Sequence, residues 1–269
     1  MKNHFFSNQE QDLNDQFLDQ GYIVIDVEDT RALDQIRELI VGEIGRQLGH
    51  TLPGGPSNIL NSIADHLSVE ALNDFRVEIH SRINANSTLK NNYFRTAKNA
   101  LEALVGNELA MQRRINLSIQ MPSDFSSLLP VHSDVWSGCS PYEIVLWVPM
   151  VDCFGTKSMY ILPRAIDQKV QAKMHKNADQ GAEGLFNAIK DDVVWLDVPY
   201  GKAVIFSQAL MHGNIVNQEA ETRWSLNCRF KNLFSPYSDK KIGEYYEPIT
   251  IRAASAIGLD YELPGGFDA

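Results

Sequence analysis

Residues 111–120 read MQRRINLSIQ, an alternation of apolar and polar side chains that predicts a β-strand. Successive side chains of an extended chain point to opposite faces. One face of this strand would carry Ile115, Leu117 and Ile119, and the other Asn116, Ser118 and Gln120. A strand face with three polar side chains borders either solvent or a water-filled cavity. For this strand alone, we expect solvent.

Short strands continue towards residue 234. Segments rich in β-branched and aromatic residues are Tyr142–Val151, Met159–Leu162, Val193–Val198, Ala203–Phe206 and Trp224–Phe230. Pro, Gly, Asp and Ser separate these segments. Two intervening segments, Gln168–Asn177 and Glu183–Lys190, are expected to be helical. Many short strands with turn signals between them predict a jelly roll or barrel.

The chain before residue 108 has helical periodicity instead. Helices are expected at Gln9–Gln20, from Thr30 onward, and at Ile59–His66, Val69–Ile83 and Lys90–Val105. A short strand is expected at Tyr22–Val27, and the stretch TLPGGPSN at 51–58 is expected to be a loop. We therefore expect a single domain over 1–269, with a mostly helical part at 1–108, a β core at 111–234 and a C-terminal extension at 235–269.

Composition narrows the class of partner. The 269 residues carry a net charge of −10, which argues against nucleic acid or an anionic membrane surface. Three widely spaced cysteines without a CxxC motif predict neither a zinc finger nor a disulfide framework. No apolar run is long enough for a signal peptide or a membrane span. We expect a soluble, cytoplasmic protein that acts on a small molecule.

His132-Ser133-Asp134 is a candidate for metal binding. Residues i and i+2 of an extended chain share a face, so an imidazole and a carboxylate here can hold one divalent metal. The triplet alone is weak support, because 7 histidines and 34 acidic residues make about one such triplet expected by chance. The reversed pattern, Glu78-x-His80, lies in a predicted helix, where its side chains would not face each other.

His212 is the candidate third ligand. It follows the predicted strand at 203–206 and lies in the sequence MHGN, which is expected to be a turn. A rolled sheet would bring it to His132 across the mouth of the barrel. Two histidines and one carboxylate leave three octahedral positions open, as in non-haem Fe(II) oxygenases. Taken alone, His212 is better explained as a turn histidine that binds no metal.

Arg223 favours the metal-site interpretation. It lies eleven residues after His212, near the start of the segment TRWSLNCRF, and Ser225 lies on the same strand face. A guanidinium binds a carboxylate through two hydrogen bonds, and a buried one near a metal needs an anion. The alternative is a surface ion pair. Arg229 is a competitor that would lie about 20 Å further along the strand.

These motifs together resemble the phytanoyl-CoA dioxygenase superfamily. The resemblance rests on HSD at 132–134, IVLWVPMVD at 144–152, GKAVIF at 201–206, HGN at 212–214 with Asn217, and RWS at 223–225. The entry segment EQDLNDQFLDQGYIVIDV at 10–27 is also similar, so the resemblance spans nearly the whole chain. HSDVWSGCSPYE and TKSMYILP further resemble oxygenases found with carbohydrate and aminoglycoside biosynthesis genes.

The resemblance implies a mainly β fold with a helical N-terminal part, built on a double-stranded β-helix of the cupin type. It implies Fe(II) held by His132, Asp134 and His212. Related halogenases have a small residue in place of Asp134, so this carboxylate implies hydroxylation or a related oxidation.

The resemblance also implies 2-oxoglutarate as co-substrate and O2 as oxidant, with release of succinate and CO2. The far carboxylate of 2-oxoglutarate would bind Arg223 and Ser225. Gln120 and Trp147 would line the same pocket, although an exposed amide and a core aromatic explain these two equally well. The substrate would be a sugar or sugar derivative.

The chain departs from the family in the loop after the strand at 159–162. Many relatives have Gly-Ser-His there, whereas this chain reads ILPRAIDQ at 161–168. Arg164 and Lys157 would then be available to an anionic substrate group, although solvated surface charges are the simpler interpretation.

Three other hypotheses remain. A cupin-like isomerase or epimerase would need the metal ligands but not Arg223. A non-catalytic relative would bind a ligand without turnover. A purely structural jelly roll would leave the order of His132, Asp134, His212 and Arg223 unexplained.

Overall fold

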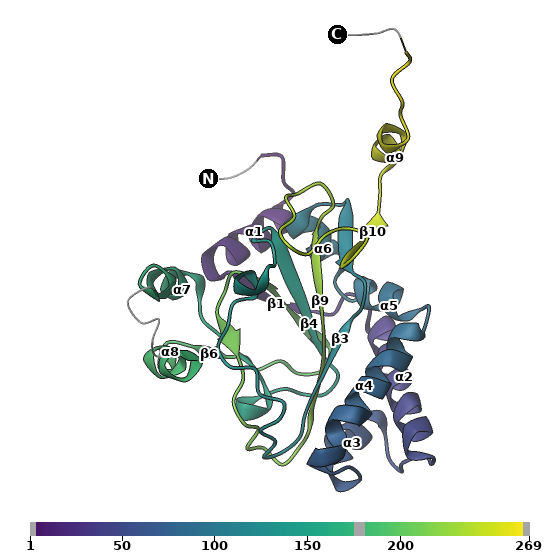
Figure 1. Cartoon of the computed structure of the whole chain (residues 1–269), viewed down its shortest axis with the longest axis vertical. Coiled ribbons are helices and arrows are strands. Elements are labelled where there is room, and N and C mark those ends of the chain that lie inside the picture. The colour runs from purple at the N-terminus through teal and green to yellow at the C-terminus, as the bar shows by residue number, and fades with distance from the viewer. Residues whose placement is uncertain (1–3, 175–180, 266–269) are drawn as a thin grey trace.

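Two antiparallel sheets form the centre of the computed structural model, which describes residues 4–174 and 181–265 (Figure 1). The larger sheet has the order β1–β7–β4–β9–β2–β10, and β3 also pairs with β9. Its strands are β1 Tyr22–Asp26, β2 Leu109–Gln112, β3 Asn116–Gln120, β4 Glu143–Pro149, β7 Lys202–Ser207, β9 Arg223–Asn232 and β10 Tyr246–Thr250. The smaller sheet, in the order β6–β5–β8, consists of β5 Tyr160–Ile161, β6 Val194–Trp195 and β8 His212–Gly213.

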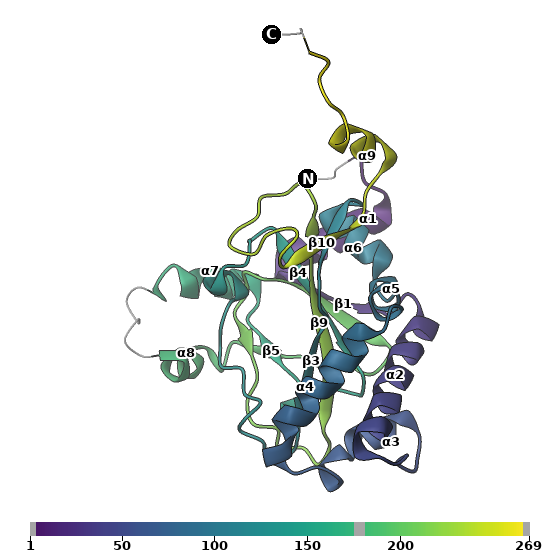
Figure 2. The ribbon, with the colours of Figure 1, turned by 45° about the vertical axis from the view of Figure 1, so that its right-hand side comes forward.

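Helices cover one face of the larger sheet. They are α1 Asn8–Gln20, α2 Thr30–Leu48, α3 Pro56–Asn61, α4 Val69–Ala85, α5 Leu89–Arg95 and α6 Lys98–Val105. Later in the chain come α7 Arg164–Gln171, α8 Gly181–Ile189 and α9 Ala253–Leu259, with short 3-10 turns at Ile63–Asp65, Asp134–Ser137 and Gly155–Lys157. Figure 2 shows α2 and α4 side by side, with α4 next to β3, and α9 away from the body of the molecule. No described helix is long and apolar enough to cross a membrane.

The central strand β9 separates the helical layer from the interior of the two sheets. Its alternate apolar residues Trp224, Leu226, Cys228 and Phe230 are fully buried. The indole of Trp224 packs edge-on against Phe75 and donates to the carbonyl of Leu60 at 2.8 Å, and Phe230 stacks on Tyr93. The intervening residues Arg223, Ser225, Asn227 and Arg229 therefore face away from the helices. Because side chains alternate along β9, one face of the strand packs against the helices and the other face is polar.

Several predicted boundaries are wrong for local reasons. The predicted loop 51–58 ends early because Pro56 begins α3, where its fixed φ and missing N–H suit the first helical position. The predicted helix Lys90–Val105 divides into α5 and α6, because Ala97 has non-helical φ −149° and the Thr96 hydroxyl donates to the Tyr93 carbonyl at 2.7 Å. The helix expected at Gln168–Asn177 begins at Arg164, and residues 175–177 lie outside the described part of the chain.

The predicted strand 111–120 is interrupted at Arg113–Ile115. There the side-chain amide of Asn84 on α4 accepts from the Ile115 N–H at 2.8 Å and donates to the Ile115 carbonyl at 2.9 Å. This side chain takes the place of a neighbouring strand, so the chain bends between β2 and β3. The 235–269 segment contains β10, which pairs with β2, and α9, neither of which the sequence analysis predicted.

Candidate metal centre and co-substrate pocket

The segment His132-Ser133-Asp134 is extended at its central residue, with φ −122° and ψ 133° at Ser133. This conformation directs the Ser133 side chain away from its neighbours, and its hydroxyl donates to the carbonyl of Gln208 at 2.9 Å. His132 and Asp134 consequently lie on the other side together, as the i, i+2 spacing predicts. The distance from His132 Nε2 to Asp134 Oδ1 is 3.9 Å.

His212 meets His132 as its direct partner in a β-bridge. The His132 N–H donates to the His212 carbonyl at 3.0 Å, and the His212 N–H donates to the His132 carbonyl at 2.9 Å. The predicted turn at His212 is wrong: His212 and Gly213 form β8, which pairs with β5. One ligand atom from each of His132, Asp134 and His212 lies within 4.8 Å of the others.

Hydrogen bonds orient both imidazole rings. The Nδ1 atom of His132 lies 2.8 Å from the Pro130 carbonyl, and that of His212 lies 2.9 Å from the Leu210 carbonyl. A carbonyl only accepts, so each Nδ1 carries a proton, and Nε2 is the ring nitrogen that remains for a metal. Phe206 packs at 4.9 Å against the His212 ring. The three groups therefore present two imidazole nitrogens and a carboxylate to one point.

The charge of this site is set by burial and by Arg229. Burial raises the pKa of the Asp134 carboxyl, but Arg229 and His212 lower it by more, so the group is ionised. Arg229 donates to Asp134 Oδ1 at 2.9 Å. Burial, followed by the neighbouring His132, lowers the pKa of His212 to about 4. A neutral imidazole beside an ionised carboxylate is the protonation state that a divalent metal requires.

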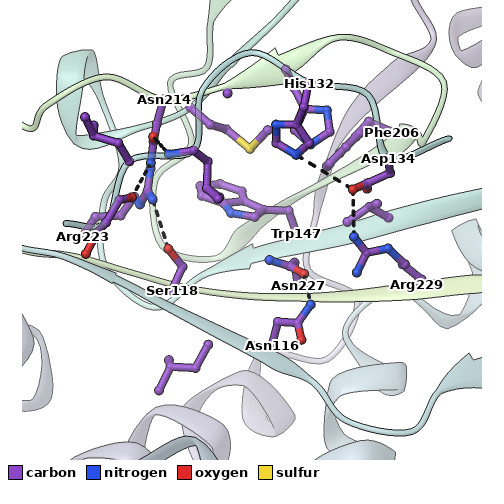
Figure 3. Close-up of a pocket in the computed structure, with 18 of the residues that line it drawn as sticks. Asn116, Ser118, His132, Asp134, Trp147, Phe206, Asn214, Arg223, Asn227 and Arg229 are labelled. Carbon is purple, nitrogen blue, oxygen red and sulfur yellow. Dashed lines mark hydrogen bonds and ion pairs between the residues drawn. The ribbon is translucent and has the colours of Figure 1, made fainter. Parts of the chain in front are cut away.

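A cavity of about 430 Å³ opens beside these groups and is drawn in Figure 3. Asn116 and Ser118 of β3 line it, and the Asn116 side-chain amide donates to Asn227 of β9 at 2.9 Å. The register pairs Ser118 with Ser225 and Gln120 with Arg223. The expectation that the polar face of β3 borders solvent is therefore wrong. The pairing with β9 turns that face inward, which no property of β3 alone indicates.

Arg223 lies at the far end of this cavity from Arg229, with Trp147 between them (Figure 3). It is only 3% exposed, and burial lowers the pKa of its guanidinium to about 10, so it stays charged near neutral pH. Its Nη1 donates to the Ser158 carbonyl at 2.9 Å and its Nη2 to the Ser118 hydroxyl at 3.1 Å. Within residues 4–174 and 181–265, Arg223 has no carboxylate partner, and its Nε has no acceptor.

Of the other residues predicted to bind the co-substrate, one lines the cavity and two are buried next to Arg223. Trp147 lines the cavity and is 4% exposed. Ser225 and Gln120 are fully buried beside Arg223 rather than in the cavity wall. The Ser225 hydroxyl and the Gln120 Oε1 have no hydrogen-bond partner among the described residues. Buried polar atoms without partners are uncommon in folded proteins and mark a place where a ligand or water is expected.

The other cations considered from sequence have different roles. Arg229 is held by Asp134, so it is not available as a co-substrate anchor. Lys157 is not a surface charge, because it is fully buried and paired with Glu221 at 2.6 Å. Arg164 donates to the Leu18 carbonyl at 2.7 Å and does not line the cavity.

Asn214 is a site residue that sequence analysis missed. It lines the cavity two residues after His212, and its Oδ1 accepts from the Leu129 N–H at 2.7 Å. Asn116 had been placed on the polar face of its strand and expected to border solvent, and its partner Asn227 had not been considered. Asparagine is common in turns, so only the fold distinguishes a cavity amide from a turn residue.

Comparison with solved structures identifies the fold. Apo ThoJ, a non-heme monooxygenase, aligns with a TM-score of 0.57 over 91% of this chain and 85% of its own, at 14% identity. HygX from Streptomyces hygroscopicus with nickel and 2-oxoglutarate bound gives 0.53 over 88% and 90%, at 12% identity. SnoK, an alpha ketoglutarate dependent carbocyclase from nogalamycin biosynthesis, gives 0.51 over 86% of each chain, at 14% identity. These likenesses confirm the predicted double-stranded β-helix with N-terminal helices. No protein-family model and no curated protein sequence matches the chain.

Proposed function

We propose that this chain is an Fe(II)- and 2-oxoglutarate-dependent oxygenase that hydroxylates or otherwise oxidises a small molecule, releasing succinate and CO2. One observation carries the proposal: a buried, charged guanidinium without a carboxylate partner in the described chain shares a cavity with a His-Asp-His cluster. A metal-binding isomerase needs the cluster but not that guanidinium. Burying Arg223 without an anion is costly unless a ligand supplies one.

The residues present fit both groups. Two neutral imidazoles and one carboxylate suit Fe(II) and leave three octahedral positions for other ligands. The distal carboxylate of 2-oxoglutarate would accept from Arg223 and from the unpartnered Ser225 hydroxyl, whereas the unpartnered Gln120 Oε1 is itself an acceptor and cannot bind a carboxylate directly. The solved structures of HygX with 2-oxoglutarate and of SnoK, named as alpha ketoglutarate dependent, support the choice of co-substrate.

The protein's own side chains would bind, orient and shield. His132, Asp134 and His212 would hold the metal, and Arg223 would fix the co-substrate's direction. Trp147 and Phe206, both buried cavity residues, would exclude water from the reacting atoms. The bound metal and 2-oxoglutarate supply the oxidising chemistry that no protein side chain provides.

The cavity walls support a small polar substrate. Polar and aromatic side chains both line the cavity. The amide and hydroxyl groups come from Asn116, Ser118, Ser127, Asn214 and Asn227, and the indole comes from Trp147. Such walls suit hydroxyl groups and a ring face, so we propose a substrate related to a carbohydrate, as the HSDVWSGCSPYE resemblance implies. Neither nucleic acid nor a membrane surface is part of this proposal.

The test is anaerobic addition of Fe(II) and then 2-oxoglutarate to purified protein. We expect a metal-to-ligand charge-transfer band in the visible spectrum, followed by succinate release when air and candidate sugars are added. His132→Ala and His212→Ala should lose metal binding and the band together. Tight metal binding without a band would instead support a cupin-like isomerase. Absence of metal binding would support a non-catalytic relative.

A further inference from the structure

A second cavity of about 740 Å³ adjoins the first. Both are lined by Asn116, at the point where the chain bends between β2 and β3. The second cavity lies between α4, the bend at Arg113 and Arg114, and the segment before β10. Its walls include Asn84, which holds the bend, and Tyr245. The bend that interrupts the predicted strand therefore creates a space directly next to the metal cavity.

Unpaired arginines surround the shared wall. Arg76 lines the first cavity, and Arg113 and Arg114 line the second. Over the two described stretches of the chain, none of the three has a carboxylate partner. Arg76 donates to the Asn73 side chain at 2.9 Å and Arg113 to the Gly243 carbonyl at 2.8 Å, so both keep free donors.

The acidic groups of this cavity do not cancel the arginines. Two carboxylates, Glu244 and Glu247, line the second cavity, and Glu247 is paired with Lys90. Among the residues that the structure describes, Glu244 is therefore the one lining carboxylate that could offset the charge of Arg113 and Arg114. His80 faces the same space, and burial followed by Arg114 lowers the pKa of its imidazole. This local positive excess contrasts with a net charge of −10 for the whole chain. A concentration of unpaired cations at a cavity raises the local concentration of anions.

The second cavity is also connected to the metal ligands. Gln112 and Tyr245 line it, and both contact Arg229: the guanidinium donates to Gln112 Oε1 at 3.2 Å and to the Tyr245 hydroxyl at 3.1 Å. Arg229 in turn holds Asp134. Two layers of side chains, Gln112 with Tyr245 and then Arg229, therefore separate a molecule in the second cavity from Asp134. Asn116, which is only partly buried, borders both cavities.

We infer that the substrate carries a phosphate or carboxylate group, which binds Arg113 and Arg114 with Arg76 at the rim, while its oxidised carbon extends past Asn116 to the metal. This inference rests on the proposed function. Guanidinium groups bind these anions through paired, charge-assisted hydrogen bonds. The anionic group would thereby set which end of the substrate faces the metal.

The test uses Co(II)-loaded protein with saturating 2-oxoglutarate, which occupies Arg223. Phenyl phosphate, benzoate and the neutral benzamide serve as probes, and paramagnetic relaxation of their ring protons reports proximity to the metal. The expected result is enhanced relaxation for phenyl phosphate, benzoate or both, and little for benzamide. The stronger of the two anions identifies the anionic group.

The variant Arg113→Gln/Arg114→Gln removes two charges from the second cavity. We expect it to bind the anionic probe about tenfold more weakly. The matched control is Arg31→Gln/Lys98→Gln, which makes the same change in net charge at two exposed residues that line neither cavity. The control should bind like the unchanged protein.

The outcomes separate this inference from the proposed function. If 2-oxoglutarate fails to bind to the metal-loaded protein, the proposed function fails, and the inference fails with it. If 2-oxoglutarate binds but the anions relax no faster than benzamide, only the inference is overturned. Equal loss of probe binding in the control and in Arg113→Gln/Arg114→Gln would also overturn it, because net charge alone would explain the binding.

Discussion

Arg223 and Arg229 lie on one face of β9, yet their electrostatic situations are opposite. Arg229 has Asp134 at 2.9 Å, which compensates its burial. Arg223 has only a serine hydroxyl and a carbonyl as acceptors. Sequence analysis favoured Arg223 as the anchor and kept Arg229 as a competitor, because the acid that pairs with Arg229 is distant from it in sequence. The HxD spacing, by contrast, is local, so the His132–Asp134 proximity was predictable.

We predict that Arg223→Met weakens 2-oxoglutarate binding without lowering the free energy of unfolding to a similar extent. Loss of a buried charge-assisted contact should weaken 2-oxoglutarate binding about 30-fold or more. The free energy of unfolding without ligand should not fall correspondingly, because the substitution removes an uncompensated buried charge. Titration calorimetry on metal-loaded protein and urea unfolding of the metal-free protein measure the two effects.

Arg164→Met is the matched control for this substitution, since Arg164 lies outside the cavity. It should leave 2-oxoglutarate binding unchanged. Unchanged binding in Arg223→Met would mean that another group anchors the co-substrate.

Elements were predictable wherever periodicity is local. The helix that begins at Thr30 and the alternation of β3 were both predicted, and the helix buries Leu33, Ile36, Ile40 and Ile44. The bend between β2 and β3 was not, because its cause is Asn84, a side chain from α4. Strand β10 was missed since its stability comes from pairing with β2 rather than from its own pattern.

At this scale we predict that Asn84→Ala destabilises the fold. The substitution leaves the N–H and the carbonyl of buried Ile115 without partners, which should lower the free energy of unfolding by about 2 kcal/mol or more. The shift in urea midpoint at constant m-value measures it. Asn91→Ala on α5 is the control, because Asn91 is exposed, and it should change the free energy by less than about 0.5 kcal/mol. Equal effects would show that Asn84 does not maintain the bend.

The whole molecule brings together residues that no local pattern connects. The polar faces of β3 and β9 oppose each other, and His132 and His212 pair, only because the chain rolls into two sheets. Short strands with turn signals between them already predicted a jelly roll or barrel, and the family resemblance specified a double-stranded β-helix. The second cavity was invisible in the sequence, since its walls come from α4, the bend and the segment before β10.

The metal-free molecule should lose stability on mild acidification. Burial lowers the folded-state pKa of His212 from 6.5 to about 4, so the unfolded chain binds this proton first. The stabilising contribution of neutral His212 is fully present above its pKa in the unfolded chain. It is lost as the pH falls towards its pKa in the folded protein. Between those values the free energy of unfolding should fall by up to about 1.4 kcal/mol per pH unit from this group. The lowered pKa of Asp134 acts in the same direction, below its ordinary value of 3.8.

Urea unfolding at a series of pH values measures this dependence. His212→Gln should reduce the slope between the two pKa values, and His66→Gln, an exposed histidine, should not. An equal slope in unchanged protein and in His212→Gln would contradict the assignment.

The two backbone hydrogen bonds that join His132 and His212 have a consequence for how the site is assembled. Both histidines are held by the protein's own backbone, and both rings are oriented by carbonyls before any ion arrives. A metal ion would therefore bind to a site that is already formed, unlike the ion of a zinc finger, which supplies the folding energy. A chelator should abolish the activity of this protein without unfolding it, and the fold should be unchanged after repeated removal and return of the metal.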